Sequence, residues 1–168
     1  MASLKEQSVY NGGMVVLKVK GVQIGRAKSI TARRSYGTEG VYEIDSIMPQ
    51  EHIYNKYEGS VSLSKFLIRK ADFVANGITW LGEDILKGGV LDIEVIDKTT
   101  NKTLRCYHGC SVQDYSENFQ ANAISGEDAN FVYLYCTDGD GRGNYITDWS
   151  QYQYVENGSP ANASIADI

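Results

Sequence analysis

The stretch GVYEIDSIMPQEHIYNKYEGSVSLSKF, residues 40–66, decides how this chain folds. Over residues 54–64 it alternates between apolar and polar side chains, as a half-buried strand does. Its middle, residues 47–54, is neither a regular strand nor a short turn, and it holds one of only 2 prolines in the chain. Most connections in compact domains are about six residues or shorter, so this long semi-apolar connection needs a partner to cover it.

The composition bounds the class of protein. A length of 168 residues predicts one domain, and 12 Tyr and 17 Gly against 2 Pro favour strands and turns. The net charge of −5 disfavours stable nucleic-acid binding, which needs Lys and Arg to contact phosphates. The sequence has neither a signal-peptide pattern nor an apolar run of about 18 residues. Its 3 cysteines do not suggest a secreted disulfide framework, so we expect an intracellular protein with no membrane partner.

Periodicity and turn residues predict a mainly β fold. We expect an antiparallel β-sandwich or half-barrel with one flanking α-helix, preceded by a polar arm at 1–13 and followed by an extended tail at 138–168. Ser64 is the expected N-cap of the helix, and Asn76-Gly77 is its expected end. The predicted elements of the domain at 14–137 are a long hairpin at 14–35, a strand at 54–64, a helix at about 64–76, and strands at 90–97, at 103–119 with a bend at Gly109, and at 129–137.

Cys106, His108 and Cys110 are the strongest candidates for a metal site. On a straight strand, residues two apart share a face but lie about 7 Å apart, whereas zinc needs its ligands within about 2.3 Å of one centre. A bulge at Gly109 could bring them closer, with Cys136 as a fourth ligand. We expect packed free thiols, and zinc ligation is the alternative.

Other motifs give little support for an enzyme. The segment DGDGRGN, 138–144, resembles the start of a calcium loop, but Asp148 is not followed by the closing Glu, and a flexible linker is the favoured interpretation. No nucleophile elbow occurs, and GEDILKGG at 82–89 lacks the Lys-Ser/Thr ending of a phosphate loop. We therefore expect no catalytic residue, no cofactor and no metal.

The connection at about 36–56 is too apolar for an idle loop. If the sandwich is complete in itself, these side chains can be buried only against another copy of the chain. The residues predicted to make contacts between subunits or rings are Tyr42, Ile44, Ile47, Met48, Pro49, His52, Ile53 and Tyr54.

Two runs carry a resemblance to a known family. IGRAKSITARRSYGTEGVYEIDSIMPQEHIYNKYEGSVSLSKF and GCSVQDYSENFQANAISGEDANFVYLY resemble tail tube proteins of tailed bacteriophages, especially those of contractile tails. With the first hairpin, the resemblance covers roughly residues 8–137. It implies a β-sandwich with a flanking helix, hexameric rings stacked into a hollow tube, and a loop around 36–56 that reaches the adjacent ring or subunit. It also implies no enzymatic activity and no cofactor.

The resemblance further implies partners and a location. The expected partners are other copies of the chain, with tail sheath, baseplate and tape measure proteins, and DNA only in transit during ejection. The expected location is the virion tail, assembled in the host cytoplasm. Glu58, Asp92 and Glu94 are the expected lumen-lining residues, because each lies opposite an apolar strand face and a carboxylate repels DNA phosphate.

Two alternatives remain from sequence alone. One is the inner tube of a related injection machine, either a phage-tail-like bacteriocin or a type VI secretion system. The other belongs to a different class: a monomeric β-sandwich that binds carbohydrate through exposed Tyr and Trp side chains.

Overall fold

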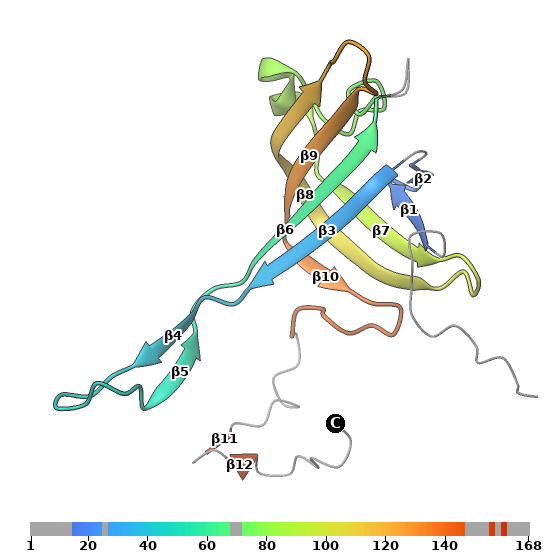
Figure 1. The fold of residues 1–168 in the computed structure, drawn as a ribbon. Helices are drawn as coiled ribbons and strands as arrows, with labels where there is room; N and C mark the ends of the chain where they lie inside the picture. The colour runs from blue at the N-terminus through green and yellow to red at the C-terminus, as the bar shows by residue number, and fades with distance from the viewer. Residues whose placement is uncertain (1–14, 25–26, 68–71, 147–154, 157–158, 161–168) are drawn as a thin grey trace, which may run out of the picture.

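The computed structural model describes residues 15–24, 27–67, 72–146, 155–156 and 159–160 (Figure 1). The arm expected at 1–13 lies outside the described residues. The elements are β1 (Val15–Val19), β2 (Val22–Gln23), β3 (Ala27–Ser35), β4 (Thr38–Val41), β5 (Glu51–Tyr54), β6 (Glu58–Phe66), the 3-10 helix η1 (Gly82–Lys87), β7 (Leu91–Asp97), β8 (Thr103–Asn118), β9 (Gly126–Tyr133), β10 (Tyr135–Thr137), β11 (Val155–Glu156) and β12 (Ser159–Pro160).

One open, antiparallel, eight-stranded sheet forms the body, with the order β2-β1-β7-β8-β9-β6-β3 and with β10 paired to β8. Strand β8 belongs to both halves, because its residues 103–110 pair with β7 and its residues 111–118 pair with β9. We call β2, β1, β7, β10 and the first half of β8 the β7 layer. The second half of β8, with β9, β6 and β3, is the β3 layer. The predicted mainly antiparallel β fold is confirmed.

The change of partner along β8 falls between Cys110 and Ser111, next to a bend at Gly109. This residue has a φ of 67°, a left-handed conformation that favours glycine, and an added Cβ would lie 2.7 Å from Leu134 Cδ1. The N–H of Leu134, between β9 and β10, donates to the His108 carbonyl at 3.0 Å. The predicted bend at Gly109 is therefore confirmed, and both strands that meet there turn together.

The core lies between the two layers. Strand alternation places one side chain in two inside, so Val61 and Leu63 of β6 face Ile93 of β7, and all three are fully buried. Further members of this cluster are Leu17, Val19, Phe73, Ile78, Leu91, Tyr107, Cys110, Ala129, Phe131 and Tyr133. The strand predicted at 90–97 is present as β7, and the one predicted at 54–64 corresponds to β6, which begins later, at Glu58. The single strand predicted at 129–137 is two strands, β9 and β10, which separate at Leu134.

The single long hairpin predicted at 14–35 was wrong. β1 pairs with β2 through a tight turn in which Lys20 and Gly21 both have positive φ, as a two-residue hairpin turn requires. β3 pairs instead with β6, at the opposite edge of the sheet. The reason is burial, because Ile30 and Ala32 of β3 lie beside Leu63 and Val61 of β6.

The α-helix predicted at about 64–76 was also wrong where the structure describes it. Strand β6 continues through Ser64 to Phe66, and the residues from 72 onward form turns, with one helical bond from Asn76 N to Asp72 O of 3.1 Å. Gly77, at a φ of 69°, ends these turns. Across the described ranges the only helix is η1. It lacks the length and apolar character that a helix needs to span a membrane.

Candidate functional site

The outward face of the β3 layer is a field of short polar side chains. Alternation along β6 buries Val61 and Leu63, so the serines that alternate with them point outward. Ser62 Oγ lies 2.7 Å from Asn130 Oδ1, and the Ser64 hydroxyl donates to the Asp128 carboxylate. By register, this face carries Ser29, Thr31, Arg33 and Ser35 of β3, Glu58, Ser60, Ser62 and Ser64 of β6, Asp128, Asn130 and Val132 of β9, and Ser111, Asp114, Ser116 and Asn118 of β8.

The β3 layer has two unpaired edges within the described part of the chain. β3 pairs only with β6, and residues 111–118 of β8 pair only with β9. The four strands alternate in direction, so the β3 edge runs antiparallel to the β8 edge. Unpaired edges of this length template the addition of another strand, and natural proteins cover or close them.

A two-stranded arm, β4 and β5, projects from the body where β3 ends and β6 begins (Figure 1). Residues 51–54, expected to be irregular, are strand β5. The residues predicted for contacts between copies all lie on this arm, and its apolar side chains are exposed. Their exposed fractions are 61% for Tyr42, 94% for Ile44, 97% for Ile47, 69% for Met48, 41% for Ile53 and 78% for Tyr54, and Pro49 and His52 are also exposed.

The three acidic residues predicted to share a surface do not come together. Glu58 lies on the polar face of the β3 layer, with its carboxylate 3.0 Å from Lys56 Nζ. Asp92 and Glu94 lie on β7, in the other layer. The Asp92 carboxylate accepts from the Gly109 N–H at 3.1 Å and lies 3.7 Å from His108 Nδ1.

The bend at Gly109 separates the candidate metal ligands. Cys106 Sγ lies 3.7 Å from His108 Nδ1, whereas Cys110 joins the core and donates to the Tyr107 carbonyl. His108 Nε2 is 2.7 Å from Thr137 Oγ1. Burial raises the pKa of both the Cys106 and Cys110 thiols to about 12, which disfavours the thiolate that zinc requires. No group of three metal-ligating side chains is found among the described residues.

The segment 138–144, interpreted from sequence as a flexible linker, forms a hydrogen-bonded turn in the structure. The Asp138 carboxylate accepts from the backbone N–H of Asp140 and Arg142 at 2.9 and 3.0 Å, and from Arg142 Nε at 2.6 Å. These hydrogen bonds, with the Arg142 backbone as the largest cause, lower the pKa of Asp138. The carboxylate is thus occupied by the chain's own donors. Asp148 lies outside the described residues.

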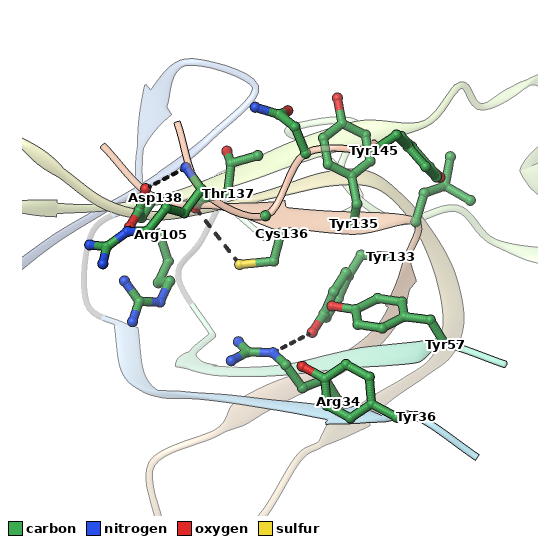
Figure 2. A pocket seen from close by; sticks show the side chains of 14 residues that line it. Arg34, Tyr36, Tyr57, Arg105, Tyr133, Tyr135, Cys136, Thr137, Asp138 and Tyr145 are labelled. Atoms are coloured by element: carbon green, nitrogen blue, oxygen red, sulfur yellow. Dashed lines mark hydrogen bonds and ion pairs between the residues drawn. The ribbon is translucent and has the colours of Figure 1, made fainter. Parts of the chain in front are cut away.

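A pocket of about 710 Å³ opens between the layers at the end where the arm begins (Figure 2). Arg34 Nε donates to Tyr133 Oη at 3.4 Å, and this bond is the main cause that raises the pKa of Arg34. Sequence reasoning missed this pocket, for which the only signal was the high tyrosine content. Its lining is Arg34, Tyr36, Tyr57, Arg105, Tyr133, Leu134, Tyr135, Cys136, Thr137, Asp138, Arg142, Gly143, Asn144 and Tyr145.

Comparison with known proteins gives one family. The model of the Phi812 tail tube protein family matches residues 4–137. The chain is 47% identical over 134 residues to "Virion protein 5" of Enterococcus phage phiEF24C, covering 80% of this chain and 96% of that protein.

Solved structures share the fold at low sequence identity. The SPP1 tail tube matches with a TM-score of 0.58 and 10% identity, over 88% of this chain and 87% of that chain. The sheath/tube terminator structure of an extracellular contractile injection system, PVC, matches with a TM-score of 0.60 and 11% identity, over 78% of this chain and 96% of that chain. At these identities the likeness concerns the fold alone.

Proposed function

Because this chain belongs to the Phi812 tail tube protein family, we propose that copies of it close into hexameric rings and that the rings stack into the tube through which phage DNA is ejected. It is a structural component of the phage virion tail. The single observation that carries the ring proposal is the pair of unpaired, antiparallel edges on the β3 layer.

Ring closure pairs the β3 edge of one copy with the β8 edge of the next. Each copy contributes four strands to the closing layer, and four is an even number. The alternation of strand direction is therefore preserved across every junction, whatever the number of copies. A heterologous contact of this kind generates a ring when its rotation closes, and closure removes both exposed edges.

The polar face of the β3 layer lines the lumen in this proposal. Its short hydroxyl and amide side chains dominate the surface offered to passing DNA, with Phe66 and Val132 as apolar members. Glu58, Asp114 and Asp128 share the face with Arg33, while Lys56 pairs with Glu58 and Lys28 Nζ lies over the Phe66 ring. The charges therefore nearly balance, and phosphate meets no strong cationic patch. Glu58 thus stays a lumen candidate, whereas Asp92 and Glu94, on the β7 layer, are assigned to the outer part of the ring.

The arm carries the contact between stacked rings. Isoleucines with 94% and 97% exposure, at Ile44 and Ile47, gain most from burial against another copy. We place the tube in a contractile tail, with a sheath around it, and with baseplate and tape measure proteins as further partners. Catalysis and cofactors have no part in this role.

The alternatives are less well supported. The match to a phage virion protein at 47% identity favours a phage tail over a bacteriocin or a type VI secretion tube. A monomeric carbohydrate-binding module would leave the arm and both sheet edges without a use.

Electron microscopy of the purified full-length protein, with sedimentation velocity at increasing concentration, tests the proposal. We expect sixfold rings or hollow tubes above a threshold concentration. A monodisperse particle of 18.6 kDa at every concentration would contradict it.

A further inference from the structure

We propose that the pocket between the layers is the receptor for the arm tip, residues 42–48, of a second copy of this chain. This inference rests on the proposed function, because it names the surface that covers the exposed arm. Part of the pocket lining comes from residues 138–145, which lie outside the segment that the family model matches.

The pocket offers positive charge that the subunit itself does not neutralise. Neither Arg34 nor Arg105 has a carboxylate within ion-pair distance in the described ranges, and their side chains bond to the Tyr133 hydroxyl and the Leu104 carbonyl. Arg142 differs, because Asp138 and Asp140 both contact it. The two arginines therefore provide sites for acidic groups from another molecule.

The remaining walls are aromatic and aliphatic. Tyr36 and Tyr57 stand on one side, at the arm base, and Tyr135 and Cys136 of β10 on the other (Figure 2). Tyr36 and Tyr57 pack edge to face with ring centroids 5.5 Å apart. Burial and the hydrogen bond with the Tyr133 hydroxyl raise the pKa of Tyr57, so this phenol stays neutral. Such walls favour aliphatic side chains between the charged contacts.

The arm tip has the complementary composition. In the sequence YEIDSIM, Glu43 and Asp45 alternate with Ile44 and Ile47, and neither acid has an ion-pair partner within the described residues. Charge complementarity of this kind fixes which surfaces meet and in which orientation.

The arm tip is also held in one shape. Asp45 has a φ of 75°, the Ser46 N–H donates to the Glu43 carbonyl at 3.3 Å, and Ser46 Oγ accepts from the Met48 N–H at 3.2 Å. Gln50 N donates to the Val41 carbonyl at 2.8 Å and closes the loop. A turn fixed by its own polar contacts, with its isoleucines left exposed, is preorganised for a partner.

The tip cannot reach the pocket of its own chain. Tyr36 and Tyr57 line the pocket at the base of the arm, and β4 pairs with β5 over four positions from Thr38↔Tyr54 to Val41↔Glu51. By strand rise, Ile44 lies about 25 Å farther along the arm than Tyr36. Figure 1 shows the arm directed away from the body, so the occupant comes from another copy.

Cross-linking to the native thiol of Cys136, which lines the pocket, tests this contact. Full-length Ile47→Cys, and separately Ile44→Cys, is assembled and oxidised with copper phenanthroline at pH 8.5. We expect a ladder of disulfide-linked copies on a non-reducing gel for at least one of them. The ladder should vanish in the Cys136→Ser background, and Val22→Cys, at a position that is also exposed but lies on β2, should give none.

Microscopy of the same samples separates the two proposals. Tubes without a ladder, or a ladder that persists after Cys136→Ser, would overturn the pocket assignment and leave the tube role intact. Absence of rings and tubes in the unmodified protein would overturn both.

A second measurement identifies what fills the pocket. Alkylation of Cys136 by iodoacetamide should proceed in the dilute monomer and slow at least tenfold in tubes. Protection already present in the monomer would mean that the chain's own residues fill the pocket, and would overturn the proposal.

Discussion

Lys65 Nζ lies 2.8 Å from Glu127 Oε1, and both side chains are buried, with exposed fractions of 2% and 0%. The same carboxylate accepts from the Tyr115 hydroxyl at 2.6 Å and from the Phe73 N–H at 3.2 Å. One ion pair thus joins neighbouring strands β6 and β9 to the segment after residue 72. It fixes that segment against the sheet that carries the polar face.

Removal of one partner of this pair should destabilise the subunit strongly. Lys65→Met leaves a buried carboxylate without its cation, and we expect the free energy of unfolding to fall by about 3–5 kcal/mol. Urea unfolding of the dilute monomer measures it. The double variant Lys65→Met/Glu127→Leu should lose less unfolding free energy than the two single variants lose together. Strict additivity of the losses would show that the pair is not coupled.

The close approach of Tyr133 to Gly59 gives a second stability prediction. A Cβ added at Gly59 would lie 2.2 Å from the Tyr133 ring, so Gly59→Ala should cost about 1–3 kcal/mol of unfolding free energy. Gly89→Ala is the matched control, because a Cβ there meets nothing within 4 Å. Equal stability of the two variants in thermal unfolding would mean that the ring does not pack on Gly59.

Charge on the arm should separate assembly from folding. Ile47 is 97% exposed, so Ile47→Asp should change monomer stability by less than about 0.5 kcal/mol while preventing tube growth. Circular dichroism and electron microscopy measure the two effects, and Ile47→Leu should behave as the unmodified protein. Normal tubes from Ile47→Asp would remove the arm from the stacking contact.

Proline scanning tests the β8 edge. In an antiparallel strand, successive N–H groups point to opposite sides, so of Ser116 and Glu117 one donates toward β9 and the other toward the free edge. Proline at the position whose N–H points to the free edge should leave the monomer folded but block rings. Proline at the position whose N–H donates to β9 should destabilise the monomer. If both variants fold and both form rings, the β8 edge is not a junction between copies.

The two sheet faces can be distinguished by thiol labelling of assembled tubes, in a Cys136→Ser background. Ser62→Cys should react with a small maleimide and far more slowly with a maleimide on a 20 kDa polymer, because the lumen restricts entry. Glu94→Cys, on the β7 layer, should react with both. The reverse pattern would assign the lumen to the β7 layer.

Sequence alone predicted the strands whose burial is local and regular. Val61 and Leu63 on β6, and Ala129 and Phe131 on β9, recur at a spacing of two, and each is fully buried. The helix prediction failed because nothing near Lys65 shows that its ammonium meets Glu127, far along the chain. The hairpin prediction failed for a similar reason, since β3 finds its partner in β6 and not in the adjacent β1.

The candidate site was predictable only in part. The exposed apolar arm could be recognised, because its composition does not fit a solvated loop. The sheet face on which each acidic residue lies could not be predicted, because the layer to which a strand belongs depends on its pairing. Glu58 and Glu94 have similar sequence surroundings and lie on different layers. The arginine and tyrosine pocket draws on six separate segments, which no local pattern connects.

A cryo-electron microscopy reconstruction of the assembled full-length protein measures the central relationship directly. The account predicts a closed ring in which β3 of each copy pairs antiparallel with residues 111–118 of β8 in the next, with Ser62 and Asn130 facing the hollow. A ring joined through other edges, or one whose hollow is lined by Asp92 and Glu94, would contradict it.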